Sequence, residues 1–269
     1  MAAGRSSGRG TSLYGTSLYA GEPSSTRRRE IDRLVLWNID LTLVDVAKVT
    51  RVAYAEAFRK VTGRPLVQLP QMAGRSEPEI FFDALALNGG DKFDAAESER
   101  LLAPFGAELA TSLADRRDLL TAQGQLMPGA VQSLAAVAGL EDTVQSVLTG
   151  SSRPNATLKL RVFGLDRYLD LFVGGFAGSE AYPKGTLLRV ARQRAEEKYG
   201  VRFAEAATAY IADSPRDVEA ARIGGAMSIA VASGRAGTAE LRDAGADAVL
   251  PDLTDTDGLV ALLTRAPHG

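Results

Sequence analysis

The sequence contains no cysteine and a single histidine, His268, which is next to the last residue. The lack of cysteine excludes disulfide bonds, thiolate catalysis and cysteine-based zinc sites. A mechanism with histidine as general base would depend on a residue of the C-terminal tail, so we set such mechanisms aside. The groups left for catalysis in any active site are therefore carboxylates, lysines and hydroxyl groups, together with a hard metal ion if one is bound.

Long apolar runs are also missing. No run approaches the roughly 20 residues that span a membrane, and the N-terminus lacks the apolar core of a signal peptide. The net charge of -2 argues against general nucleic-acid binding, although it is compatible with a local basic pocket for a small anion. With 45% apolar and 24% charged residues, we expect a soluble cytoplasmic protein without a membrane or nucleic-acid partner.

Residues 1–30 differ from the rest of the chain, because they are rich in Gly, Ser, Thr and Arg and poor in apolar side chains. Such a segment buries too little apolar area to offset the entropy lost on ordering. We therefore expect a disordered N-terminal extension.

Short apolar runs without polar alternation are typical of strands that are buried on both faces of a parallel sheet. The first is 33–39, and the others are 144–149, 169–173, 207–212, 227–231 and 246–250. Helical patterns separate the later runs, which predicts an α/β fold with a Rossmann-like parallel sheet. Between the first two runs the chain has mainly helical patterns, so we place an inserted helical domain at 47–124 and the core at 31–46 and 125–269.

Polar side chains follow several of these strands. Because ligands of open parallel sheets bind at the carboxyl ends of the strands, we expect these side chains to gather at one edge. The first strand is followed by Asn38, Asp40 and Thr42, the second ends at Thr149 and Gly150, Lys184 lies after the third, and Asp213 and Asp217 follow the fourth.

This set of side chains suits phosphoryl transfer. Paired acids such as Asp213 and Asp217 offer the oxygen ligands that Mg²⁺ prefers. A lysine holds a phosphate as a point charge, and a threonine hydroxyl with backbone N–H groups in tight turns binds the remaining phosphate oxygens. An acid two residues beyond the nucleophile can protonate the leaving alkoxide.

In order and in position, these four elements resemble the four motifs of the haloacid dehalogenase superfamily: Asp-x-Asp-x-Thr, then Ser or Thr, then Lys, then a pair of acids. The helical insertion resembles the cap of that family. The segments 127–130 and 153–165 are similar to the phosphoglycolate-phosphatase-like branch. The resemblance implies a Mg²⁺-dependent phosphohydrolase that acts on a small phosphorylated metabolite, as a monomer or homodimer.

The resemblance also implies a role for each position. Position 38 is the nucleophile and Asp40 the general acid and base. Thr42, Thr149, Gly150 and Lys184 bind phosphate, and Thr149 and Lys184 also assist catalysis. Position 38, Asp40, Asp213 and Asp217 hold Mg²⁺. Arg75 in the cap contacts substrate, although helix capping by the adjacent Ser76 explains that segment as well. Lys159 is a second candidate amine, and its position fits the exposed surface of an amphipathic helix better.

Position 38 departs from the family because it is Asn. An amide cannot form the aspartyl-phosphate intermediate, and nucleophile removal elsewhere costs on the order of a millionfold in turnover. We expect phosphohydrolysis impaired by Asn38. The alternatives are a catalytically silent binding or regulatory protein, an engineered Asp-to-Asn trap, and altered chemistry, with dehalogenation as a weaker third class. Leu41, where the family often has Gly, is a second departure and weakly favours a natural variant.

Overall fold

The computed structural model describes residues 31–89, 94–178 and 183–265. The predicted disordered extension, residues 1–30, and His268 lie outside the described residues. The described part belongs to one compact unit. None of its helices is long and apolar enough to cross a lipid bilayer.

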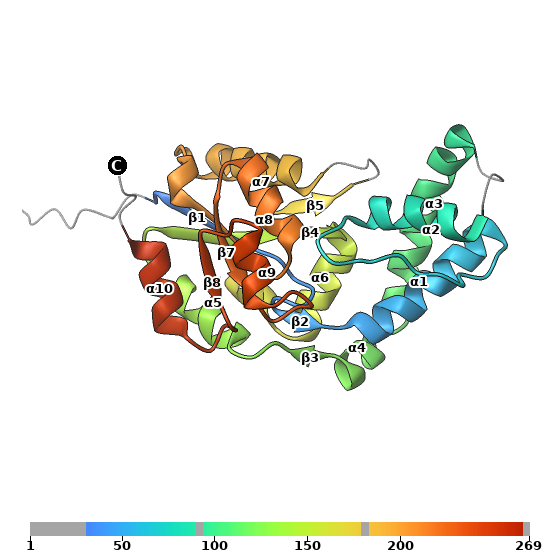
Figure 1. Cartoon of the computed structure of the whole chain (residues 1–269), viewed down its shortest axis with the longest axis horizontal. Helices are drawn as coiled ribbons and strands as arrows, with labels where there is room; N and C mark the ends of the chain where they lie inside the picture. The colour runs from blue at the N-terminus through green and yellow to red at the C-terminus, as the bar shows by residue number, and fades with distance from the viewer. Residues whose placement is uncertain (1–30, 90–93, 179–182, 266–269) are drawn as a thin grey trace, which may run out of the picture. The chain divides into compact units, whose positions relative to one another are not determined.

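A six-stranded parallel sheet forms the centre of the fold (Figure 1). Its strand order is β5-β4-β1-β6-β7-β8. The strands are β1 (Arg33–Trp37), β4 (Thr143–Ser152), β5 (Gly175–Ala177), β6 (Thr208–Ala212), β7 (Met227–Val231) and β8 (Ala248–Leu250). The expected α/β fold with a parallel sheet is confirmed.

Helices cover both faces of the sheet. They are α5 (Ala130–Ala138), α6 (Arg153–Val162), α7 (Lys184–Tyr199), α8 (Pro215–Gly224), α9 (Thr238–Asp243) and α10 (Thr256–Thr264), with 3-10 turns at Asp166–Tyr168 and Glu205–Ala207. Alternate residues of β1 point to opposite faces. Leu34 and Leu36 pack with α7 and α8, whereas Val35 and Trp37 pack with α5, α6 and α10.

The expected helical insertion lies between β2 (Val44–Asp45) and β3 (Gln125–Leu126), which pair antiparallel. It contains α1 (Ala47–Thr62), α2 (Glu77–Gly89), α3 (Ala95–Ala114) and α4 (Arg117–Gln123). Its core is aromatic: the rings of Phe81 and Phe105 stack with centroids 4.4 Å apart, and Tyr54 meets Phe105 edge-on. The boundaries of the insertion as a separate domain, 47–124, stay a prediction.

One predicted strand is wrong. Residues 169–173 form a turn, and the edge strand β5 begins only at Gly175. The Asp170 carboxylate accepts a hydrogen bond from the Phe172 backbone N–H at 3.1 Å, and the Asp170 carbonyl accepts from the Val173 N–H at 3.4 Å. This local capping by an aspartate competes with strand pairing.

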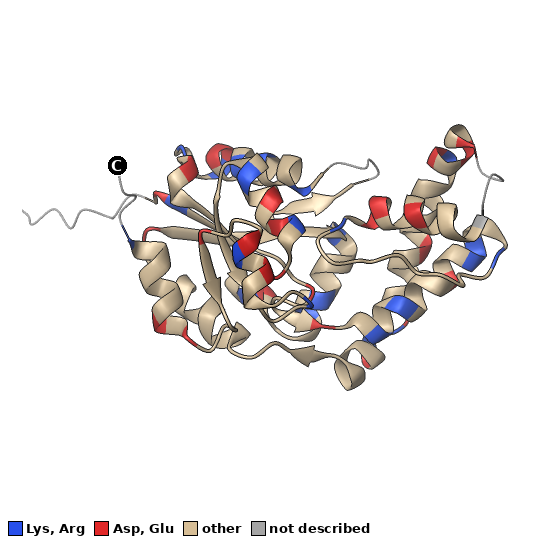
Figure 2. Ribbon diagram, in the orientation of Figure 1, with Lys and Arg blue, Asp and Glu red and all other residues tan. Residues whose placement is uncertain are grey.

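Figure 2 shows acidic and basic residues interspersed over the described part of the chain. This distribution agrees with the small net charge of the chain.

Candidate functional site

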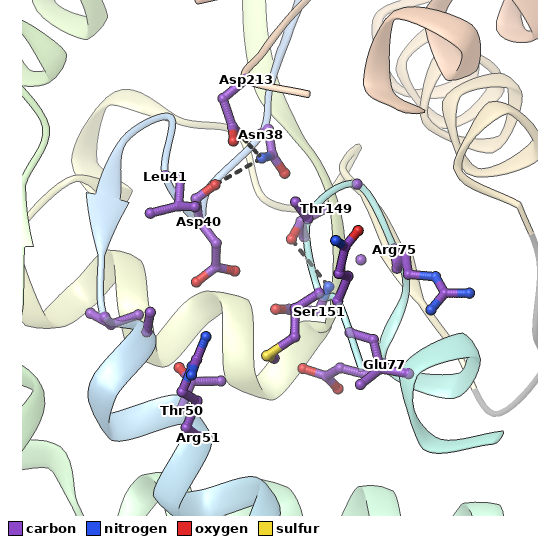
Figure 3. Close-up of a pocket in the computed structure, with 18 of the residues that line it drawn as sticks. Asn38, Asp40, Leu41, Thr50, Arg51, Arg75, Glu77, Thr149, Ser151 and Asp213 are labelled. Carbon is purple, nitrogen blue, oxygen red and sulfur yellow. Dashed lines mark hydrogen bonds between the residues drawn. The ribbon is translucent and has the colours of Figure 1, made fainter. Parts of the chain in front are cut away.

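The site lies where the three central strands end. Because β1 has β4 on one side and β6 on the other, three residues come together (Figure 3): Asn38 after β1, Thr149 in the last part of β4, and Asp213 after β6. They line a pocket with a cavity volume of about 160 Å³. Residues of α1 and of the segment 69–77 line the rest of this pocket. The predicted gathering of polar side chains at one sheet edge is therefore observed.

Asn38 is buried and fully engaged. Its Nδ2 donates to the Asp213 carboxylate at 2.9 Å, to the Asp40 carbonyl at 3.0 Å and to the Thr42 hydroxyl at 3.3 Å. Its Oδ1 accepts from Lys184 Nζ at 3.2 Å. The reversed amide would face its nitrogen toward an ammonium and its oxygen toward a carboxylate, so the neighbours fix its orientation.

Lys184 is the first residue of α7 and is 6% exposed. Besides Asn38, it contacts the Asp217 carboxylate at 2.7 Å. Asp217 is buried behind it and also accepts from Tyr210 at 2.8 Å and from the Ser214 hydroxyl at 2.5 Å. Lys184 reaches the pocket, whereas Asp217 is held in a polar cluster beneath it.

Asp213 follows β6 and is 2% exposed. Burial, followed by the negative charge of Asp217, raises the pKa of Asp213 to about 7, although hydrogen bonds from Thr42 and Asn38 act in the opposite direction. Thr42 donates to Asp213 at 2.8 Å and is itself completely buried. Thr42 therefore holds the Asp213 carboxylate in position by a hydrogen bond. The contact of Thr42 with phosphate stays a prediction.

Lys159 is buried, whereas the helical pattern predicts it on the exposed surface of a helix. It is 2% exposed and reaches into the pocket from α6. Its ammonium contacts both Asp40 carboxylate oxygens, at 2.8 and 2.7 Å, and the Ser151 hydroxyl at 3.0 Å. The sequence did carry a signal, because Ala156 and Leu160 lie beside Lys159 on the buried face of the helix.

Thr149 and Gly150 lie in the last part of β4 and line the pocket. The Thr149 hydroxyl accepts a hydrogen bond from the Ser151 backbone N–H at 3.1 Å. A Cβ on Gly150 would lie 2.0 Å from the Arg75 carbonyl oxygen, so only glycine allows the segment from the insertion to approach this closely.

Arg75 directs its side chain away from the strand ends (Figure 3) and forms an ion pair with Asp83. Ser76 and Glu79 form a capping box at the start of α2: the Ser76 N–H donates to Glu79 at 2.7 Å, and the Glu79 N–H reaches the Ser76 hydroxyl at 3.4 Å. The capping interpretation of this segment is therefore observed, and substrate contact by the Arg75 side chain stays a prediction.

Leu41 has a φ of 63°, the only positive φ of a non-glycine residue among those described. The left-handed conformation costs a side chain roughly 1–2 kcal/mol. The turn is held in this shape because Leu41 N–H donates to the Val44 carbonyl at 2.8 Å and its own carbonyl accepts from Ser233 at 2.7 Å. The preference for Gly at this position follows from that conformation.

The comparisons with known proteins agree with this geometry. The family model of haloacid dehalogenase-like hydrolases matches residues 35–222, so the chain belongs to that family. No curated protein matches. A hydrolase from Pseudomonas syringae has a TM-score of 0.60 at 20% identity, covering 87% of this chain and 100% of that one.

Two further solved structures share the fold. A predicted phosphoglycolate phosphatase from Haemophilus somnus has a TM-score of 0.58 at 16% identity, covering 85% of this chain and 98% of that one. CbbY from Rhodobacter sphaeroides, in complex with phosphate, has a TM-score of 0.60 at 20% identity, covering 86% and 99%. The predicted superfamily, with a fold like that of the phosphoglycolate-phosphatase-like proteins, is confirmed.

The family generally uses Mg²⁺, but the side chains of this site do not fit that ion as they are arranged. The Asn38 amide directs an N–H donor, rather than an oxygen, toward Asp213 and the Asp40 carbonyl. The Asp217 carboxylate already accepts hydrogen bonds from Lys184, Tyr210 and Ser214. Within 31–89, 94–178 and 183–265, no cluster of three or more His, Cys, Asp or Glu suits a metal ion.

Proposed function

We propose that the chain binds a small phosphate monoester in this pocket and hydrolyses it at a rate that Asn38 strongly reduces. One observation carries the proposal: the Asn38 amide lies directly after β1, between Asp213 and Lys184, at the position that the family resemblance assigns to the nucleophile. An amide in that position cannot form a covalent phosphoryl intermediate. Thr149, Gly150 and Lys184, to which the family resemblance assigns phosphate binding, still line the pocket.

The phosphate would lie between the end of β4 and Lys184. Thr149 and the backbone around Gly150 line the pocket there, and backbone N–H groups in such turns bind anions. The ammonium of Lys184 supplies positive charge. Because Asn38 is neutral, the phosphate meets one negative charge fewer than in a site with aspartate at this position.

Asp40 has the geometry of a proton carrier. Lys159 contacts both of its oxygens and therefore fixes the direction of the carboxylate, which points into the pocket (Figure 3). A carboxylate held in this way can accept a proton from a water molecule or return one to a leaving alkoxide. Residual hydrolysis by water activated at Asp40 is compatible with this arrangement.

A second candidate function is phosphate-ester binding without turnover. The complete set of hydrogen bonds around Asn38 favours it, because the amide is satisfied without an incoming group. Dehalogenation is a weaker candidate, because it also needs a carboxylate at position 38. Sequencing codon 38 of the source gene would distinguish a natural Asn38 from an engineered one.

The test compares this chain with Asn38→Asp for the hydrolysis of para-nitrophenyl phosphate, and for the binding of inorganic phosphate by calorimetry. We expect both proteins to bind phosphate and the variant to turn over at least about a thousandfold faster, since nucleophile removal elsewhere costs still more. No gain in the variant would refute the assignment of position 38. Ordinary turnover by the unchanged chain would refute impairment.

Three further expectations stay predictions. They are a Mg²⁺ requirement for the catalysis that Asn38→Asp would restore, location in the cytoplasm, and a monomeric or homodimeric state. The assay should therefore be run both with Mg²⁺ and with a chelator.

A further inference from the structure

One wall of the pocket carries hydroxyl groups that the proposed phosphate site does not use. Along α1, Ala47, Thr50, Arg51 and Tyr54 line the pocket, at the spacing of a single helix face. Thr50 is 5% exposed and Tyr54 is 2% exposed. This wall belongs to the helical insertion, away from the strand ends that would hold the phosphate.

The Thr50 and Tyr54 hydroxyls have no hydrogen-bond partner among the described residues, although both oxygens are buried. Thr62, on the same helix, is satisfied locally, because its hydroxyl donates to the Phe58 carbonyl at 2.7 Å. Buried hydroxyls are ordinarily paired, so each unpaired group needs an explanation. Two unpaired hydroxyls on the wall of one pocket point to a ligand that supplies the partners.

Acidic side chains set the chemistry of that ligand. Glu77 lines the same pocket, is 8% exposed and accepts a hydrogen bond from Asn155 at 2.9 Å. Asp40 and Glu77 direct their carboxylates into the pocket (Figure 3). Burial, and then the charges of Glu77 and Asp40, raise the pKa of Tyr54 well above its ordinary value, so Tyr54 keeps its proton and remains a donor.

We propose that Thr50 and Tyr54 form a subsite for hydroxyl groups of the leaving alcohol, so that the substrate is a phosphorylated polyol or small sugar. This inference rests on the proposed function and specifies the substrate class of the same pocket. Hydroxyl groups can donate to Glu77 and accept from Tyr54, whereas an anionic leaving group would meet the Glu77 carboxylate. The charge of Asp40 is already paired with Lys159. Arg51, exposed on the same wall, and Arg235, which also lines the pocket, are groups that would favour the competing anionic class.

The test is an equilibrium binding measurement by calorimetry on the unchanged chain. It is possible because Asn38 slows turnover, so the phosphate esters stay intact during the titration. The probes are glycerol 1-phosphate, n-propyl phosphate, which lacks both hydroxyls, and 3-phosphopropionate, which carries a carboxylate. A hydrogen bond contributes roughly a three- to tenfold change in Kd. We expect glycerol 1-phosphate to bind about tenfold more tightly than n-propyl phosphate, and 3-phosphopropionate to bind more weakly than glycerol 1-phosphate.

The variants Tyr54→Phe and Thr50→Val remove the hydroxyls and keep the shape of the side chains. Together they should abolish the preference for glycerol 1-phosphate and leave the Kd of n-propyl phosphate within about twofold. Thr62→Val, on the same helix but outside the pocket, should keep the preference. Because the two pocket hydroxyls lack partners in the protein, their removal should not lower the Tm.

Three results would overturn the subsite: a preference that survives in the double variant, tighter binding of 3-phosphopropionate, or a lower Tm that reveals an internal partner. If n-propyl phosphate and inorganic phosphate bind normally in any of these cases, the proposed function stands and only the subsite fails. If neither of them binds, the proposed function and the subsite both fail.

Discussion

The replacement Asn38→Asp should make the stability of the protein depend on a divalent cation. In the structure, Asn38 Nδ2 lies 2.9 Å from an Asp213 carboxylate oxygen and 3.0 Å from the Asp40 carbonyl oxygen. Aspartate would place an oxygen at that point, so that three oxygens would meet and would need a proton or a cation between them. The amide therefore performs a structural task that a carboxylate cannot perform alone.

The magnitude follows from the distances around Asn38. Two unit charges about 3 Å apart interact by roughly 5 kcal/mol at an effective dielectric constant of about 20. Repulsion from Asp213 and attraction to Lys184, whose Nζ is 3.2 Å from Asn38 Oδ1, therefore nearly cancel. What remains is the loss of a hydrogen bond to a charged group, about 1.5–3 kcal/mol, and the cost of burying a further charge.

We expect a net loss of about 2–4 kcal/mol in the free energy of unfolding when no metal is present. For a folded part of this size, each kcal/mol corresponds to roughly 2–4 °C, so the Tm should fall by about 5–15 °C. A cation bound between the oxygens would restore stability, by about 2.7 kcal/mol at 100 times its Kd.

The assay is thermal unfolding of both proteins, followed by circular dichroism, with a chelator and with Mg²⁺. The unchanged chain should respond little to Mg²⁺, whereas Asn38→Asp should unfold early with the chelator and recover with the ion. Asn155→Asp is a matched control, because Asn155 is also buried and donates to a carboxylate, that of Glu77. It should lose stability without recovery. Equal stabilisation of the unchanged chain by Mg²⁺ would refute the reasoning.

Three other changes test separate parts of the structure. In the Asn38→Asp background, Lys159→Met should lower kcat about 10- to 100-fold in a phosphatase assay, because Asp40 loses the group that orients it. Gly150→Ala should cost about 1–3 kcal/mol in urea unfolding, because its Cβ would meet a backbone carbonyl at 2.0 Å, whereas Gly106→Ala, with open space, should be neutral or stabilising. Phe105→Ala should cost about 3–5 kcal/mol in the same assay, because it removes a buried, stacked ring.

The parts of the fold that the sequence predicted well depend on local signals. The run 227–231 corresponds to β7 without any shift, and the mainly helical stretch after the first strand contains α1, α2, α3 and α4. Strand ends are local as well, which is why Asn38 and Asp213 could be placed together before their distance was known. Edge strand β5 was misplaced, because the capping of the turn by Asp170 is not encoded in an apolar pattern.

Lys159 was missed for a different physical reason. A helical pattern shows which residues share a face, but it does not show which polar residue at the margin of the buried face will find a partner. Asp40, the partner of Lys159, lies 119 positions away in the sequence. A buried lysine is stable only when such a partner is present, so its burial depends on the tertiary structure as a whole. The unpaired hydroxyls of Thr50 and Tyr54 escaped prediction for the same reason.

The surroundings of Asn38 also explain how the site can keep its shape without a nucleophile at this position, as we propose. An aspartate here would need a cation to hold it beside Asp213, and removal of that cation would leave buried carboxylates in repulsion. The amide supplies its own N–H donors to the same oxygens and an acceptor to Lys184. Under the proposed function, Asn38 thus replaces a carboxylate and an ion by one neutral group, so the pocket can remain folded without the ion and without the attacking atom.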